Sequence, residues 1–242
     1  MTPHVKRGIF QRYPEMARKR ITRFTGDLRE HPRYSIEEAA AYLRIPATTL
    51  HAWARGQNYV TKAGKHKQMA PVIELADSNN KLLSFYNLAE AHVLRSTTER
   101  GVPLKNVRRA LDYIREEFPS VHPLLSHDFE TAGSDVFIRH LGKTVNATKH
   151  GQFAMRQILR KYLQKIKRDE FGMPTEISPI HARRLAIAIA VSSGRPVVRG
   201  TGIVASVLRD RREAGETIPE LARDYGLSPI EVRQAIQELA AA

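Results

Sequence analysis

The sequence predicts an α+β fold that is mostly α, with an N-terminal winged helix-turn-helix, a central β-hairpin plus a long helix, and a C-terminal helix-turn-helix domain. Apolar residues recur at helical spacing in residues 34–56 and again in 216–240, and a tight turn interrupts each stretch once. Short apolar runs separated by Asp, Ser, Asn or Gly indicate the β part. We expect four domains, with the boundaries 1–33, 34–119, 120–181 and 182–242.

Residues 1–33 mix Arg and Lys with isolated aromatic residues and show no sustained apolar period. This composition predicts a basic arm that is weakly ordered or becomes ordered on a partner.

The first helix pair has start and stop signals that agree with the helical spacing of its apolar residues. Ser35 and Glu38 have the spacing of a capping box, and Pro46 ends the first helix. The residues expected to face inward are Ile36, Ala39, Ala40, Leu43, Leu50, Trp53 and Ala54. The second helix keeps a polar outer face, which is the shape that suits the major groove of DNA.

A polar and basic loop at 57–70 separates this pair from two short apolar runs, 71–75 and 82–85. The Asp-Ser-Asn-Asn turn at 77–80 is typical of a hairpin, so the two runs predict a wing directly after the helix-turn-helix. Two further helices are expected at 87–101 and 104–118.

In the middle of the chain, residues 124–129 and 134–140 are joined through Thr131-Ala132-Gly133, which predicts a second hairpin. A long helix follows, with an apolar stripe at Met155, Ile158, Leu159, Tyr162, Leu163 and Ile166. The opposite face is rich in Arg and Lys, which indicates either a solvated surface or a contact with nucleic acid.

The C-terminal unit is capped at both of its last helices. Thr217 and Glu220 form one capping box, Gly226 makes the turn, and Ser228 and Glu231 cap the last helix. The inward residues of this pair are Ile218, Leu221, Ala222, Tyr225, Val232, Ala235, Ile236 and Leu239. Because every capping residue stands where the helical spacing of the apolar residues begins or ends, a second helix-turn-helix is predicted here.

The charge of the chain favours a polyanionic partner. The net charge is +14, and residues 1–70 hold 14 Lys and Arg against 5 Asp and Glu. A basic field concentrated on and before the first helix pair is typical of proteins that bind the phosphate backbone of DNA.

Several other functional classes lack their motifs. The chain has no cysteine, so disulfides and thiolate metal sites are excluded. The triplet Gly142-Lys143-Thr144 lacks the earlier glycine of a phosphate-binding loop, because Phe137 stands there, and only helical patterns follow Gly200-Thr201-Gly202. We expect no enzyme, no cofactor and no metal, and the absence of a long apolar run predicts a cytoplasmic protein without membrane contact.

The residues expected to contact DNA lie on the outer faces of the two second helices and in the basic loop. They are Thr48, Thr49, His51, Arg55, Lys62, Lys65, Lys67, Arg233 and Gln234. The alternative for the first pair is a packing unit without DNA contact, and for the last helix it is dimerisation or partner binding.

Residues 34–118 resemble a MerR-type winged helix, through the run S-I-x-E-A-A-x-Y-L-x-I-P-x-T-T-L-x-x-W, a wing, and two helices split by E-R-G-V-P-L. Thr49, Leu50 and Trp53 match the pattern, whereas MerR relatives usually carry Arg and an aromatic residue where this chain has His51 and Ala52. The relatives' effector-binding part is absent, so this resemblance does not imply a small-molecule sensor.

Residues 193–239 are similar to a small domain, once of unknown function, found in VapB-type antitoxins. The similar segments are S-G-R-P-V-V-R-G-T-G-I and A-G-E-T-I-P-E-L-A-R-D-Y-G-L-S-P-I-E-V-R-Q-A-I, with Gly202 where most members have Arg. Together the resemblances imply an antitoxin that pairs with a VapC-type PIN-domain ribonuclease and represses its own operon.

We therefore expect a non-enzymatic repressor that is a homodimer, because two-fold operators offer a second half-site. The alternative is a protein-interaction module that only sequesters its partner and does not bind DNA. A nuclease or recombinase accessory is a third hypothesis, which the scattered carboxylates and histidines disfavour.

Overall fold

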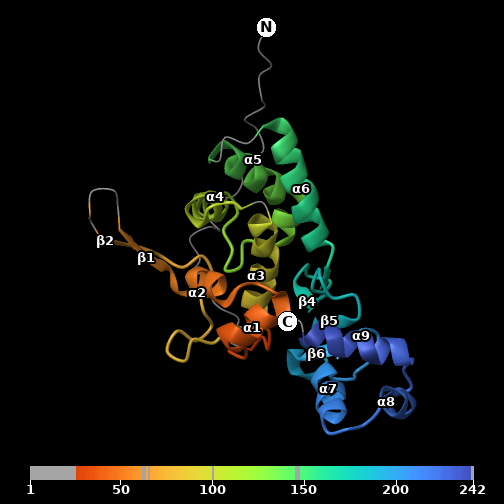
Figure 1. The fold of residues 1–242 in the computed structure, drawn as a ribbon. Helices are drawn as coiled ribbons and strands as arrows, with labels where there is room; N and C mark the ends of the chain where they lie inside the picture. The colour runs from red at the N-terminus through yellow and green to blue at the C-terminus, as the bar shows by residue number, and fades with distance from the viewer. Residues whose placement is uncertain (1–25, 61–63, 65, 100, 145–147, 241–242) are drawn as a thin grey trace.

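The computed structural model describes residues 26–60, 64, 66–99, 101–144 and 148–240. Within them the fold is mostly helical with two small antiparallel sheets, which confirms the predicted α+β class. Figure 1 shows the N-terminal helix pair, α1 and α2, between a helical region that contains α3 to α6 and a C-terminal region that contains α7 to α9.

The first helix pair forms as its caps predict. Helix α1 spans Ile36–Leu43, and Ser35 and Glu38 make the complete capping box. Arg44 ends α1 in the left-handed conformation with a φ of 49°. Helix α2 spans Ala47–Arg55, and all the predicted inward residues of the pair are buried.

The wing exists but lies earlier in the chain than predicted. Strand β1, Gln57–Val60, pairs with β2, His66–Met69, in the segment expected to be a loop. The predicted strands at 71–75 and 82–85 are wrong. Val72 and Ile73 are buried, and their amides donate to the carbonyl oxygen of Trp53, so this apolar run is a core loop that covers the end of α2.

Helices α3 and α4 follow as expected, at Phe85–Thr98 and Leu104–Glu117. Nearly all of α3 is buried, including polar residues such as Asn87 and His92. It is therefore the central helix, and it contacts α1, α6 and β4.

The predicted central hairpin is wrong, because the segment is helical. A π-helical turn at Phe129–Gly133 leads directly into α5, Ser134–Thr144. The rings of Phe129 and Phe137 meet edge to face with centroids 5.9 Å apart, and Phe137, Ile138 and Leu141 are buried at helical spacing. Packing of these aromatic residues into the core therefore overrides their local preference for strands.

The long helix α6, Lys149–Leu163, is followed by a sheet that the sequence did not predict. Four antiparallel strands pair in chain order: β3 Ile166–Arg168, β4 Pro174–Ile177, β5 Leu185–Ala188 and β6 Pro196–Val198. The expected inward residue Ile166 is buried, but it lies in β3 and not in the helix. A single 3-10 turn at Ser192–Gly194 connects β5 to β6.

The C-terminal helices are α7, Ala205–Glu213, α8, Ile218–Tyr225, and α9, Pro229–Ala240. The capping box of Thr217 and Glu220 forms, and Gly226 ends α8 in the left-handed conformation. Tyr42 of α1 packs against the cluster of buried residues in this region as well as against the main core.

Residues 26–33 are docked on the core, which corrects the expectation of a weakly ordered arm for that stretch. Arg29 pairs with Asp169 at 2.6 Å, and the hydroxyl of Tyr86 donates to Asp27 at 2.9 Å. These contacts tie the entry of α1 to both α3 and the turn between β3 and β4. The rest of the predicted arm, residues 1–25, lies outside the described residues.

Candidate nucleic-acid interface

Four of the predicted DNA contacts lie together on the outer face of α2. Thr48 and Arg55 are exposed, and Thr49 and His51 are half-buried. The opposite face of α2 is held in the core by Leu50 and other apolar residues, so helical spacing alone turns the four polar side chains outward.

His51 has a fixed partner on α1. Its Nε2 lies 3.0 Å from the Glu37 carboxylate. A backbone hydrogen bond at the start of α1 and the bond with His51 lower the pKa of Glu37, which keeps this carboxylate ionised beside the recognition face. The arrangement restrains His51 and places one negative charge next to the helix.

Three adjoining hollows extend this face beyond α2. One, of about 520 Å³, lies between α2 and the wing, and a second, of about 440 Å³, lies between α2 and the loop before α4. A third, of about 630 Å³, lies between the wing and the start of α4. Gln57, the first residue of β1, lines all three, so they form one continuous surface around the base of the wing.

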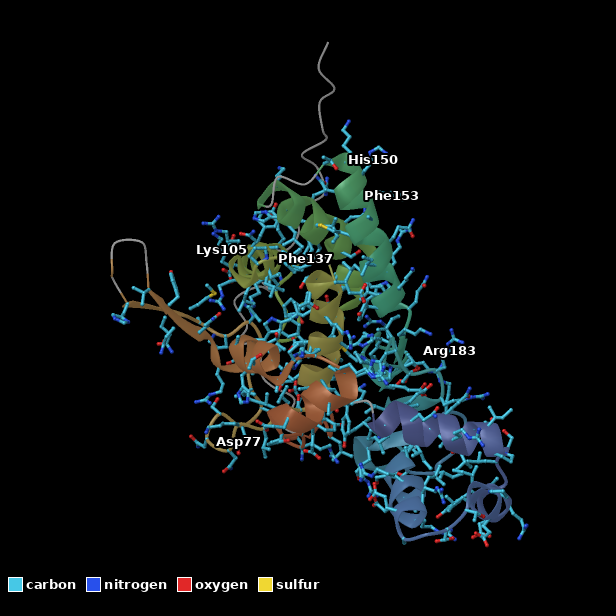
Figure 2. All side chains as sticks on the ribbon, viewed as in Figure 1. Asp77, Lys105, Phe137, His150, Phe153 and Arg183 are labelled. Atoms are coloured by element: carbon cyan, nitrogen blue, oxygen red, sulfur yellow. The ribbon has the colours of Figure 1, made fainter. Side chains whose placement is uncertain are left out.

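The first two turns of α4 add cations that sequence analysis missed. Lys105 and Arg109 are exposed, Arg108 is half-buried, and all three line the third hollow with Tyr59. The Nη2 atom of Arg108 is buried without a hydrogen-bond partner, and burial lowers the pKa of this guanidinium. Figure 2 shows Lys105 on the same side of the molecule as the wing. The Lys-x-x-Arg-Arg spacing after Pro103 was the available signal, because it places three cations on one helix end.

Of the three lysines predicted in the loop at 57–70, only Lys67 lies among the described residues. Lys67 lies in β2 opposite Tyr59 of β1. Lys62 and Lys65 lie outside the described residues.

The two predicted residues of the last helix lie apart from this surface, because Figure 1 places α9 on the other side of α1 from the wing. Arg233 is exposed. Gln234 accepts a hydrogen bond from Arg184 at 2.8 Å, and Glu231 pairs with the same guanidinium at 3.1 Å. The Glu238 carboxylate accepts from the backbone amides of residues 183 and 184. One side of α9 is therefore already hydrogen-bonded to residues 183 and 184 of the same chain.

Among the described residues, no group of three or more His, Asp or Glu side chains is placed to hold a metal ion. Across the same residues, each helix is too short or too polar to cross a lipid bilayer.

Comparison with known proteins supports the resemblances predicted from the sequence. Residues 32–111 match the family model described as "Putative DNA-binding HTH domain", and residues 187–237 match the one described as "Protein of unknown function (DUF433)". A curated relative from Mycobacterium tuberculosis, named "Putative antitoxin VapB45", is 29% identical over 228 residues, which are 87% of this chain and 95% of the relative.

The fold also matches a solved structure. The crystal structure of Rv2018 from Mycobacterium tuberculosis has a TM-score of 0.63 and 25% sequence identity, and the match covers 85% of this chain and 98% of that chain. The resemblance to a VapB-type antitoxin is thus confirmed along most of the chain, together with an N-terminal helix-turn-helix domain.

Proposed function

We propose that this protein is the antitoxin of a type II toxin–antitoxin pair, and that it acts in the cytoplasm as a homodimer. In this proposal it binds operator DNA as an autorepressor and neutralises a VapC-type PIN-domain ribonuclease, without catalysis of its own. The proposal that the protein binds DNA rests on the polar outer face of α2, which is flanked by the wing and by the cations of α4.

On this hypothesis α2 enters the major groove, with Thr48, Thr49 and His51 nearest the base edges. Arg55 and the cations at the start of α4 would contact phosphates on either side. Arg108 supports this role because it lines the hollow between the wing and the start of α4 together with Lys105 and Arg109. Lys62, Lys65 and Lys67 would add further phosphate contacts.

The toxin part of the proposal rests on the relative that is named as an antitoxin. The domain boundaries at 34–119, 120–181 and 182–242 remain part of the proposal, with DNA binding assigned to the first. Because α9 lies away from the wing, Arg233 and Gln234 would serve a second contact surface, for DNA or for a protein.

Fluorescence anisotropy with a duplex from the protein's own promoter tests the DNA part. Affinity should fall steeply between low and moderate salt, with a slope in log–log form of about −0.9 for each phosphate contact. Arg55→Ala should weaken binding and reduce that slope by about 1. Arg223→Ala is the matched control, because it removes an exposed Arg of α8 that has no proposed role in DNA binding.

The second candidate is a sequestering module that does not bind DNA, which the hydrogen-bonded and covered side of α9 favours for the C-terminal part. Undiminished promoter binding by Arg55→Ala and Thr49→Ala, with loss in Arg233→Ala, would move the DNA contact to α9. Binding that is absent in all forms, with toxin ribonuclease activity still inhibited, would establish the sequestering module instead.

A further inference from the structure

The outer side of α6 is a basic surface that the proposed contact with operator DNA does not use. Met155, Leu159 and Leu163 are buried at helical spacing, and α6 contacts α3 and α5. Figure 1 places α6 on the opposite side of the helical region from the wing. The exposed residues on the outer side of the helix, which we call the α6 face, are Lys149, His150, Phe153, Gln157, Arg160 and Lys161.

The α6 face carries positive charge that the fold does not balance. Helix α6 contains no Asp or Glu. Among the described residues, none of Lys149, Arg160 and Lys161 forms an ion pair. Arg156, at the edge of this face, pairs with Asp135 of α5 at 2.7 Å. The cations of the face itself are therefore available to an external anion.

The end of α5 brings a further cation to the beginning of α6. A Cβ atom added to Gly142 would lie 2.5 Å from Cγ of Gln152, so the glycine lets α5 approach the first turn of α6 closely. Lys143 directly follows this glycine and is exposed. The basic surface therefore continues from α6 onto the end of α5.

Phe153 lies between the cations with its ring in solvent, since the residue is 57% exposed. Lys149 precedes it by four residues and Arg160 follows it by seven, so both lie on the same side of the helix, about 6 Å and about 10 Å away along its axis. Figure 2 shows His150 and Phe153 at the end of α6 that points away from the C-terminal helices. An exposed ring flanked by cations is the arrangement on which unpaired bases stack while their phosphates are neutralised.

We propose that the α6 face binds single-stranded nucleic acid, with an unpaired base stacked on Phe153 and the neighbouring phosphates in contact with Lys149 and Arg160. The charge favours a polyanion. The ring favours a polyanion with unpaired bases, because a duplex keeps the faces of its bases stacked inside. From Lys149 to Lys161 the face is about 18 Å long, which matches a strand of about 3 to 5 nucleotides.

Fluorescence anisotropy of the full-length protein with a labelled ten-nucleotide single strand, made as RNA and as DNA, tests this site. Phe153→Ala should weaken the binding of both strands about tenfold. Lys149→Gln combined with Arg160→Gln should also weaken binding and should reduce the log–log salt slope by about 1.4, because each phosphate contact of a single strand contributes about 0.7. Both strands share the stacking and phosphate chemistry, and the one that binds more tightly identifies the source of the ligand.

A DNA strand of the same length with abasic sites in place of its bases separates stacking from charge. It keeps the phosphates, so the charge variant should weaken its binding, whereas Phe153→Ala should leave its affinity unchanged.

Matched variants separate the α6 face from the rest of the surface. Phe171→Ala removes a ring that is 79% exposed in the turn between β3 and β4, and it should leave single-strand binding unchanged. Arg212→Gln combined with Arg223→Gln removes two exposed cations of α7 and α8 and should have little effect. Arg55→Ala should weaken the binding of the promoter duplex but not that of the single strands, so a failure of this site and a failure of the operator contact are distinguishable.

Equal affinity of the wild type, Phe153→Ala and the charge variant for the single strands would overturn the proposal. So would an equal loss in Phe153→Ala for the abasic strand, because the ring would then act without stacking. Unchanged single-strand binding together with loss of the complex with a co-expressed VapC-type toxin would assign the α6 face to a protein instead. Circular dichroism establishes that each variant is folded, since all the substituted side chains are exposed.

Discussion

The buried hydroxyl of Tyr34 donates a hydrogen bond to the carbonyl oxygen of Gly194, 160 residues later in the chain, at 2.9 Å. Gly194 has a φ of +75°, and a Cβ atom built on it would lie 2.2 Å from the Tyr34 hydroxyl oxygen. The contact joins the residue before the N-cap of α1 to the turn between β5 and β6, so it holds the first helix pair against the sheet.

Gly194→Ala should therefore destabilise the protein by about 2–4 kcal/mol, from backbone strain and the clash with Tyr34 together. Urea unfolding measures the change in free energy. Gly200→Ala is the matched control, because Gly200 has a φ of +78° but no atom within 4 Å of the added Cβ, so strain alone should cost about 1–2 kcal/mol. Equal losses in the two variants would show that the Tyr34 contact contributes nothing.

His122 should make stability fall at alkaline pH. Burial alone would lower its pKa, but Glu90 and Glu30 on either side raise it to about 10. Since the folded pKa exceeds the unfolded value, this stabilisation is complete below about pH 6.5 and is lost as pH rises toward 10, by up to about 1.4 kcal/mol per pH unit.

Denaturant unfolding between pH 6 and 10 should show this slope in the wild type and a flatter one in His122→Phe. The variant should also lose about 3 kcal/mol or more at neutral pH, because two carboxylates are left without their cation. Glu30→Gln removes one of the two carboxylates that raise the pKa of His122, so its decline should begin at the same pH but end at a lower pH than in the wild type. An unchanged slope in His122→Phe would contradict the assignment.

His92 should have the opposite effect at acid pH. It is buried on α3 with Nε2 3.1 Å from the carbonyl oxygen of Tyr162, and burial lowers its pKa to about 4. A depressed histidine pKa means that protonation favours the unfolded chain, so stability should fall as pH drops from about 6.5 through 4. His92→Gln keeps a donor without titrating, and its unfolding free energy should depend less on pH between 4 and 6.5. The same slope in both proteins would exclude His92 as a source of the acid sensitivity.

Glu37→Gln should strengthen DNA binding while reducing sequence discrimination. The change removes a negative charge beside α2 and releases His51 from its partner at 3.0 Å. We expect a few-fold gain in affinity for a scrambled duplex and a smaller gain for the promoter, measured by anisotropy at fixed salt. A larger gain for the promoter would mean that the pair with Glu37 does not orient His51 for reading bases.

The elements predicted correctly are those in which several local signals agree. The capping boxes at Ser35 and Thr217, the left-handed residue at Gly226 and the apolar period all specify the same helices, and tertiary packing has only to fix their angle. The outer face of α2 follows from that period, so Thr48 and Arg55 could be assigned before the structure was known.

The errors concern segments whose structure depends on distant contacts. All four residues of β1 are exposed, so the wing has no alternating pattern of apolar and polar residues. The apolar run at 71–75, which predicts a strand, instead covers the end of α2. Strand β5 also lacks an alternating pattern, but for the opposite reason, because every one of its residues is buried. Phe129 and Phe137 suggested strands, yet their ring contact is made within a helical segment.

Arg108 shows a similar limit for the candidate DNA surface. Its spacing with Lys105 and Arg109 can be read from the sequence, but the burial of one of its nitrogens without an acceptor cannot. That property arises only when helices far apart in the chain are assembled, so a sequence pattern does not contain it.

The position of Tyr42 has a consequence for how such proteins can diversify. Its side chain is partly buried and packs against both the main core and the C-terminal cluster. A C-terminal region of this kind therefore cannot be fused to a different N-terminal domain as an independent domain. The new N-terminal domain would need an aromatic ring at the matching position of its first helix. Recombination without such a ring would leave a cavity in both apolar clusters.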